Sequence, residues 1–241
     1  ALTLPLVITV AMLGPLDWGP VIGGYLAALL LASAYAAIGL FISSRTDNQI
    51  VALIVTALLG GILYLIGTAN ISSLFGGTTG GVLRALGTGS RFESIERGVI
   101  DLRDLVYYLS ITLFFLVLNT FSVDSKRWSH GLRTLNYRRS ASLFASLIGI
   151  NLLVLNAWLT PLQGLRLDLT AQQEYSLSQT TKDLLGNLQE PLLIRGYISE
   201  KSHPLLNPLR PRVADLIREY VIAGQGKVTG EVIDPITDPD L

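Results

Sequence analysis

Two uncharged apolar segments, residues 23–44 and 50–67, most strongly constrain how this chain can fold. Each has roughly the 17 to 25 residues that a helix needs to cross the hydrocarbon core of a bilayer. They are separated by only five polar residues, which are Arg45, Thr46, Asp47, Asn48 and Gln49. Because these five cannot be buried in lipid, they must lie at a membrane face, and the two segments form a helical hairpin. The sequence therefore predicts an integral membrane protein.

The composition indicates a membrane part followed by a water-soluble part. Half of the 241 residues are hydrophobic, 15% are charged and the mean hydropathy is +0.49, which is too apolar for a typical soluble domain. The charged residues of segment 1–67 are Arg45, Asp17 and Asp47, whereas residues 162–241 contain 8 basic and 11 acidic side chains. The absence of cysteine excludes disulfides and thiol chemistry.

Further apolar segments predict more helices in the membrane. Residues 105–123 and 141–160 are each long enough to span. Residues 2–13 are too short, so we expect them to be the end of a span that starts before Ala1, in a chain that is a segment of a longer protein. The prolines and glycines of segment 14–20 interrupt the helix. Residues 68–104, with four basic and four acidic side chains, predict short amphipathic helices at the membrane interface.

The basic residues predict the orientation. Segment 124–140 is expected to be a loop, and its only acidic residue, Asp124, is outnumbered by Lys126, Arg127, Arg133, Arg138 and Arg139. Short loops rich in Lys and Arg stay in the cytoplasm. Alternation of the helices then places Arg45–Gln49 in the cytoplasm and segments 14–20, 68–104 and 161–241 outside.

The last segment, 161–241, predicts an extracytoplasmic α/β domain. Ser178 is expected to cap a helix over residues 179–188, and a second amphipathic helix is expected over residues 212–223. Strands are expected at 192–198 and 228–233. The order strand, helix, strand implies parallel pairing through a right-handed crossover.

The motifs for nucleotide hydrolysis, metal binding and nucleophilic catalysis are missing. The glycine cluster 76–81 lacks the Gly-Lys-Ser/Thr of a phosphate-binding loop. His130 and His203 are the only histidines, one on each side of the predicted membrane. Without cysteine and without a His-x-x-x-His spacing we expect no metal site. No Gly-x-Ser-x-Gly motif occurs, and one histidine on each side does not supply a Ser-His-Asp triad across the membrane. We expect a chain without catalytic residues, cofactor or nucleic-acid partner.

Two charged stretches each admit two interpretations. Arg45–Gln49 is either a solvated turn or a contact surface for a cytoplasmic partner. Residues 97–104 form either the start of an interfacial helix, with Asp101 and Asp104 favoured by the helix dipole, or part of an outer gate. The residues of this gate region would be Arg91, Phe92, Glu93, Arg97, Gly98, Asp101, Arg103 and Asp104.

Three stretches resemble known families. The first stretch resembles the permease of type-II ABC exporters. Its motifs are LDWGP (16–20), GGYL (23–26), AIGLFISS (37–44) and NQIVA (48–52). The run FESIERGVIDLRDLVYY (92–108) is similar to the outer re-entrant region of that family and the start of its last core helix. The third stretch resembles the start of the GldG auxiliary domain of gliding-motility ABC systems. It contains LDLT (167–170) and EYSLS (174–178), followed by Thr181, Leu184, Leu185, Glu190, Pro191 and Tyr197.

The resemblance covers nearly the whole chain and implies a GldF-like permease fused to a GldG-like domain in a bacterial inner membrane. Residues 1–123 would hold the last four core helices, the first only in part, with re-entrant helices at 72–98, and residues 141–160 would be an additional span. Such permeases work in pairs, here a homodimer. They are driven by separate cytoplasmic ATPase subunits, which carry the ATP and Mg²⁺. Arg45–Gln49 would face the ATPase, and a periplasmic or envelope partner would meet the outer domain.

Two other functions remain open. The complex could be a mechanical or scaffolding device that uses ATP to move envelope partners and transports nothing. Alternatively, the chain could be a receptor with the soluble domain as its binding module. A lipid, a polysaccharide, a peptide and no transported substrate are all consistent with these residues.

Overall fold

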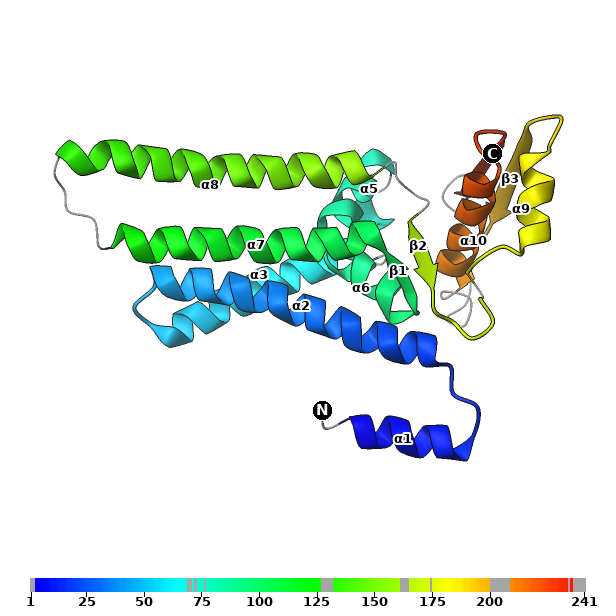
Figure 1. Ribbon diagram of the computed structural model, residues 1–241, viewed down its shortest axis with the longest axis horizontal. Helices are drawn as coiled ribbons and strands as arrows, with labels where there is room; N and C mark the ends of the chain where they lie inside the picture. Colours follow the sequence, from blue (N-terminus) through cyan, green and yellow to red (C-terminus); the bar gives the residue numbers. More distant parts are fainter. Residues whose placement is uncertain are drawn as a thin grey trace. The chain divides into compact units, whose positions relative to one another are not determined.

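The computed structural model describes residues 3–68, 71, 73–75, 77–126, 132–160, 165–173, 175–199, 209–233 and 235. The chain forms two compact units, Ala1–Leu169 and Thr170–Leu241. In the described residues the first unit consists of helices and one pair of short strands, and the second is a small α/β unit. Figure 1 labels most elements of both units.

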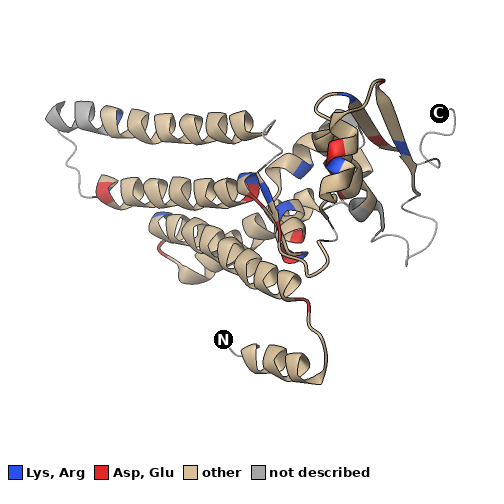
Figure 2. Cartoon of the chain, turned by 45° about the vertical axis from the view of Figure 1, so that its right-hand side comes forward, with Lys and Arg blue, Asp and Glu red and all other residues tan. Residues whose placement is uncertain are grey.

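Four helices of the first unit are long and apolar enough to cross a membrane, as predicted (Figure 1). They are α2 (Trp18–Arg45), α3 (Gln49–Gly67), α7 (Leu102–Ser125) and α8 (Leu132–Leu159), the last over its part Arg139–Leu159. The shorter apolar helix α1 (Leu4–Leu13) precedes them. Figure 2 shows that long stretches of these helices carry no charged residue. The protein is therefore a multi-pass membrane protein.

Side-chain caps determine where three of these helices begin. The carboxylate of Asp17 accepts a hydrogen bond from the Gly19 amide at 2.9 Å, and Asn48 accepts from the Ile50 amide at 2.9 Å. Asp101 does the same for the Arg103 amide at 2.9 Å. Pro20 thus lies in the first turn of α2, where a missing amide proton costs nothing. The predicted break at 14–20 is therefore shorter in the structure, since α2 already begins at Trp18.

The segment 124–140, predicted to be a loop, is partly helical. Helix α7 continues to Ser125 and α8 begins at Leu132, so Arg133, Arg138 and Arg139 belong to α8. Leucine and arginine favour helices, and the described part of this segment contains neither glycine nor proline. The helix therefore continues beyond the apolar stretch from which the span was predicted. Residues 127–131, which include His130, lie outside the described residues.

Helix α2 is the centre of the first unit. Its buried residues Ala27, Leu30, Ala34 and Ile38 face α7, α3 and the short helix α6 (Gly89–Glu96) described below. Small side chains let helix backbones approach closely, which is how helices associate in membranes. Side chains on α3 such as Leu53 (69% exposed) face away from the protein and toward the expected lipid.

In the described residues, a 3-10 turn (η1, Ser73–Phe75), two short α-helices and a strand lie between α3 and α7. Helix α5 (Gly77–Leu86) and helix α6 (Gly89–Glu96) are followed by β1 (Val99–Asp101). We call the segment Gly77–Asp101 the cap. The short helices agree with the prediction for residues 68–104, whereas the strand was not predicted.

Strand β1 pairs antiparallel with β2 (Arg166–Asp168), with Ile100 opposite Leu167. Two backbone hydrogen bonds continue the pairing, from the Leu169 amide to the Gly98 carbonyl (2.9 Å) and from the Leu102 amide to the Leu165 carbonyl (3.1 Å). Residues 165–169 consequently belong to the first unit. The second unit begins at Thr170 rather than at the predicted residue 161.

The second unit confirms the predicted strand, helix, strand order. Strands β3 (Leu192–Tyr197) and β4 (Val228–Ile233) pair in parallel, from Leu192 opposite Val228 to Tyr197 opposite Ile233. Helix α9 (Gln179–Gly186) begins at the predicted cap, where Ser178 Oγ accepts from the Thr181 amide at 3.2 Å. Helix α10 (Leu209–Ala223) starts three residues earlier than predicted. Predicted features at Glu174 and His203 fall outside the described residues.

Candidate functional site

The two groups of predicted site residues lie at opposite ends of the membrane helices. The turn between α2 and α3 is at one end, and the cap with the start of α7 is at the other (Figure 1). A membrane crossed by these helices therefore has the turn on one face and the cap on the other. The structure brings the gate residues together and keeps them apart from Arg45–Gln49.

The turn is short and exposed. Arg45 is the last residue of α2 and Gln49 the first of α3, so only Thr46, Asp47 and Asn48 lie between the helices. The Arg45 guanidinium lies 5.8 Å from the centre of the Phe41 ring, and Arg45 is exposed, like Asp47, Asn48 and Gln49. This turn is therefore accessible to another molecule at that face.

A buried ion pair joins the cap to α7. Arg91 of α6 donates from Nη1 to the Asp104 carboxylate at 2.7 Å, and Asp104 is only 9% exposed. The same guanidinium donates from Nη2 to the Ala85 carbonyl at 3.1 Å and lies over the Tyr107 ring at 4.1 Å. Arg91 thus connects both cap helices with the first turns of α7.

A second ion pair lies one turn earlier. Arg103 Nε is 3.0 Å from both carboxylate oxygens of Asp101, which is 4% exposed. Arg103 Nη1 also donates to the Thr160 carbonyl at 3.2 Å, just after the end of α8. This arginine therefore ties the start of α7 to the end of α8 and does not extend freely into solvent.

Tyrosine hydroxyls hold the turn between α5 and α6. Thr88 is fully buried there, and its carbonyl accepts from the Tyr108 hydroxyl at 2.8 Å. Tyr35 of α2 is 2.8 Å from Thr88 Oγ1 and donates to the Gly60 carbonyl at 2.7 Å, while Tyr107 donates to the Leu86 carbonyl. Sequence analysis missed Tyr35 and Thr88 as site residues. A tyrosine in the middle of a predicted span was the available signal, since a buried hydroxyl needs a partner.

The other predicted gate residues pack within the cap. Phe92 meets Tyr64 of α3 edge to face at 6.0 Å between ring centres. Gly98 has φ +87°, a conformation that favours glycine, and a Cβ there would lie 2.7 Å from the Gly19 carbonyl carbon. Arg97 and Glu93 are half-buried. The predicted gate region is thus a packed structure that contacts the start of α2, the end of α3 and the start of α7.

Burial raises the pKa of Glu93 above its ordinary value of 4.5, and nearby Arg84 and Arg97 oppose this only in part. The folded protein therefore holds the Glu93 proton more tightly than the unfolded chain does. Stability is consequently lost as the pH rises above about 4.5 and through the raised pKa, because the charged form is disfavoured in the cap.

We predict that Glu93→Gln raises the melting temperature of the detergent-solubilised protein at neutral pH and leaves it unchanged at a pH below 4.5. Melting curves of both proteins across this pH range measure the effect. An equal gain at every pH would show that the ionisation of Glu93 is not its cause.

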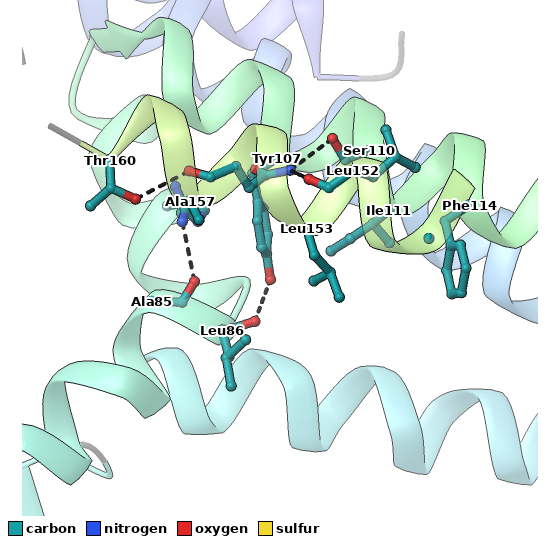
Figure 3. A pocket seen from close by; sticks show the side chains of 13 residues that line it. Ala85, Leu86, Tyr107, Ser110, Ile111, Phe114, Leu152, Leu153, Ala157 and Thr160 are labelled. Carbon is teal, nitrogen blue, oxygen red and sulfur yellow. Dashed lines mark hydrogen bonds between the residues drawn. The ribbon is translucent and has the colours of Figure 1, made fainter. Parts of the chain in front are cut away.

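A cavity of about 440 Å³ lies between α7 and α8 beside the cap (Figure 3). Arg91, Asn156 and Thr160 line one end, and Ile111, Phe114 and Leu152 line the other. Asn156 donates from Nδ2 to Ser110 Oγ at 2.9 Å and to the Leu152 carbonyl at 2.8 Å, so the two helices touch at this level. In the described part of the chain no three His, Cys, Asp or Glu side chains form a metal-binding group.

The comparisons with known proteins concern the second unit. Residues 171–241 match a family described as a domain of unknown function (DUF7088). This range corresponds closely to the compact unit Thr170–Leu241. No curated protein and no solved structure matches the chain.

Proposed function

We propose that this chain is the permease subunit of an ATP-driven ABC export complex, with ATP hydrolysed on a separate cytoplasmic subunit and a fused domain outside the membrane. The observation that carries the proposal is the cap. Two short helices leave α3, turn at Thr88 and return to α7 at the end of the helices opposite the exposed turn. The re-entrant outer region of type-II exporters, which residues 92–108 resemble, has this placement.

The proposed sidedness rests on basic residues. The first turns of α8, with Arg133, Arg138 and Arg139, lie at the same end of the helices as the turn Arg45–Gln49 (Figure 1). Basic residues flanking spans favour the cytoplasm. The turn is then cytoplasmic, in a bacterial inner membrane, and the cap is outside. The second unit directly follows β2, which pairs with the cap, and this chain connection supports an outer location for that unit.

In the proposed mechanism the ATPase acts through α2. Closure of the ATPase dimer would press on Arg45–Gln49 and tilt the α2–α3 hairpin in each of two permease copies. Helix α2 contacts α6, β1 and α7 along its length, so a tilt would move the cap relative to α7. An outward opening between the paired copies would follow. The chain itself provides contact surfaces and holds no nucleotide.

We predict that reversing both charges of the turn, Arg45→Glu with Asp47→Lys, abolishes most of the substrate-stimulated ATPase activity of the assembled complex. Opposed like charges at an interface cost several kcal/mol. The measurement is ATP turnover with the ATPase subunit in proteoliposomes. The matched control reverses the exposed Lys182 and Asp183 of the second unit and leaves turnover unchanged. Unchanged turnover in the first variant would reject a coupling role for the turn.

The β1–β2 pair favours a second candidate, a mechanical complex that moves envelope partners without transport. Strand β2 pairs with the cap, and the second unit begins two residues after its end, so the chain connection between the two is short. An assay in sealed vesicles distinguishes the two functions. A transporter moves a compound across a sealed membrane at the expense of ATP, whereas a mechanical complex hydrolyses ATP in response to its envelope partner alone.

A further inference from the structure

The lining of the cavity between α7 and α8 follows both helices, and we call this cavity the slot. On α7 its lining residues Tyr107, Ser110, Ile111 and Phe114 recur every three or four positions and so form one face. On α8 the lining runs from Gly149 to Thr160 with the same spacing. At 1.5 Å per residue these faces extend about 10 Å along α7 and about 16 Å along α8.

The slot is polar at one end and apolar along the rest. Arg91 and Thr160 mark the end beside the cap, and Nε of Arg91 is buried with no hydrogen-bond partner among the residues that the structure describes. Farther from the cap the walls are Ile111, Phe114 and Leu152. Such walls offer water no hydrogen-bond partners. The slot therefore matches an amphiphilic molecule with a polar head and an apolar chain.

Exposed apolar side chains lie at and near the slot on a helix that is long and apolar enough to cross a membrane. Leu153, which lines the slot, is 68% exposed, and Trp158 near the end of α8 is 64% exposed on a membrane helix. Tryptophan at the end of a span favours the level of the lipid headgroups. The polar end of the slot then lies at the interface, and the apolar end lies within the hydrocarbon core. This is the order in which a phospholipid presents its head and chain.

A protein helix does not fit this slot. With its side chains a helix is about 10–12 Å wide, whereas α7 and α8 are joined by the bond between Asn156 and Ser110 at 2.9 Å. The Phe114 ring also lies so close to Gly149 that a Cβ there would come within 2.7 Å of it. An acyl chain is narrow enough to lie between helices that contact each other in this way.

We propose that this slot binds one acyl chain of a membrane phospholipid, with the headgroup at the Arg91 end. The proposal is independent of transport, since it concerns a lipid held between α7 and α8 in the resting protein. A bound chain would fill the space between the last predicted permease helix and the additional helix.

The test uses the full chain in vesicles of phosphatidylethanolamine and phosphatidylglycerol. A phosphatidylglycerol with a diazirine in the half of one acyl chain nearer the headgroup is added and irradiated, and mass spectrometry identifies the labelled residues. Label is expected on Ser110, Ile111 and Leu152. Ser110 is only 8% exposed, so bulk lipid does not reach it. Label on the lipid-facing residues Leu53 and Ile54 of α3 serves as the internal reference for bulk lipid and for folding.

A matched pair of variants tests whether the acyl chain binds in the slot. Ala157 is exposed and lines the slot, so Ala157→Phe fills its mouth. Leu155→Phe adds bulk at an exposed position of α8 that is not part of the lining. Relative to label on α3, slot labelling is expected to fall about tenfold in Ala157→Phe, equal to about 1.4 kcal/mol of binding free energy, and to stay constant in Leu155→Phe.

Three results would overturn the proposal. The first is label at exposed positions only, without Ser110. The second is slot labelling that Ala157→Phe leaves intact. The third is label from a diazirine free fatty acid but none from the phospholipid, which would show that the Arg91 end excludes a phospholipid headgroup.

Discussion

Replacing Gly23 by alanine is expected to lower the free energy of unfolding by about 3 kcal/mol, near the upper end of overpacking costs. A Cβ at this position would lie 2.1 Å from the Ile95 carbonyl oxygen and 3.0 Å from Gly98 Cα. Both are backbone atoms, so no side-chain rotation relieves the contact. Ile95 is fully buried in α6, and the Gly98 amide is bound to the Ile95 carbonyl at 2.9 Å. The cap would therefore have to move away from α2.

The neighbouring residue provides the control. A Cβ on Gly24 meets nothing within 4 Å, and alanine is a better helix former than glycine by about 1 kcal/mol. Gly24→Ala is therefore expected to leave stability unchanged or to raise it slightly. Thermal unfolding of both variants in one detergent measures the difference. Equal melting temperatures for the two variants would contradict the close packing of the cap on α2.

This pair of glycines also shows how far the sequence determines the structure. The spans were predictable because lipid forces any long uncharged segment into a helix. The choice between Gly23 and Gly24 was not predictable, since it depends on which side of α2 the cap covers. Ile95 is seventy-two positions away in the chain, and nothing near either glycine indicates it.

The strands of the second unit were predictable from the sequence and strand β1 of the cap was not, for a related reason. Strands β3 and β4 are six residues each, and their apolar runs predict them locally. Strand β1 has three residues and exists because β2 pairs with it from sixty-seven positions later. The partners of Thr88 are likewise tyrosines from two other helices. Features of the first unit made by contacts between distant segments thus remained outside the prediction, although the charged residues that lie together in the cap were singled out.

The pair of Arg91 and Asp104 is expected to show the other large effect. Arg91→Met removes the 2.7 Å contact and leaves the Asp104 carboxylate, 9% exposed, without its cation at the start of a membrane helix. Breaking one partner of a buried pair costs about 3–5 kcal/mol. We expect a loss of this size in the free energy of unfolding, measured by chemical denaturation in mixed micelles.

The double variant Arg91→Met with Asp104→Leu is expected to recover much of that loss, since an apolar pair of similar size often replaces a buried ion pair without cost. Recovery will be incomplete, because the bond from Arg91 to the Ala85 carbonyl is absent in both variants. A double-mutant cycle isolates the coupling between the two side chains from this shared loss.

The exposed pair of Arg195 and Glu231, whose side chains are 42% and 46% exposed, provides the matched control within the same chain. Exposed ion pairs contribute about 0–1 kcal/mol, so Arg195→Met is expected to change stability little. If Arg91→Met were no more destabilising than Arg195→Met, or if the double variant recovered nothing, Arg91 would not connect the cap to α7 through Asp104. Because the proposed mechanism moves the cap relative to α7, loss of this pair should also raise basal ATP turnover of the assembled complex. Loss of stability without that rise would assign the pair to folding alone.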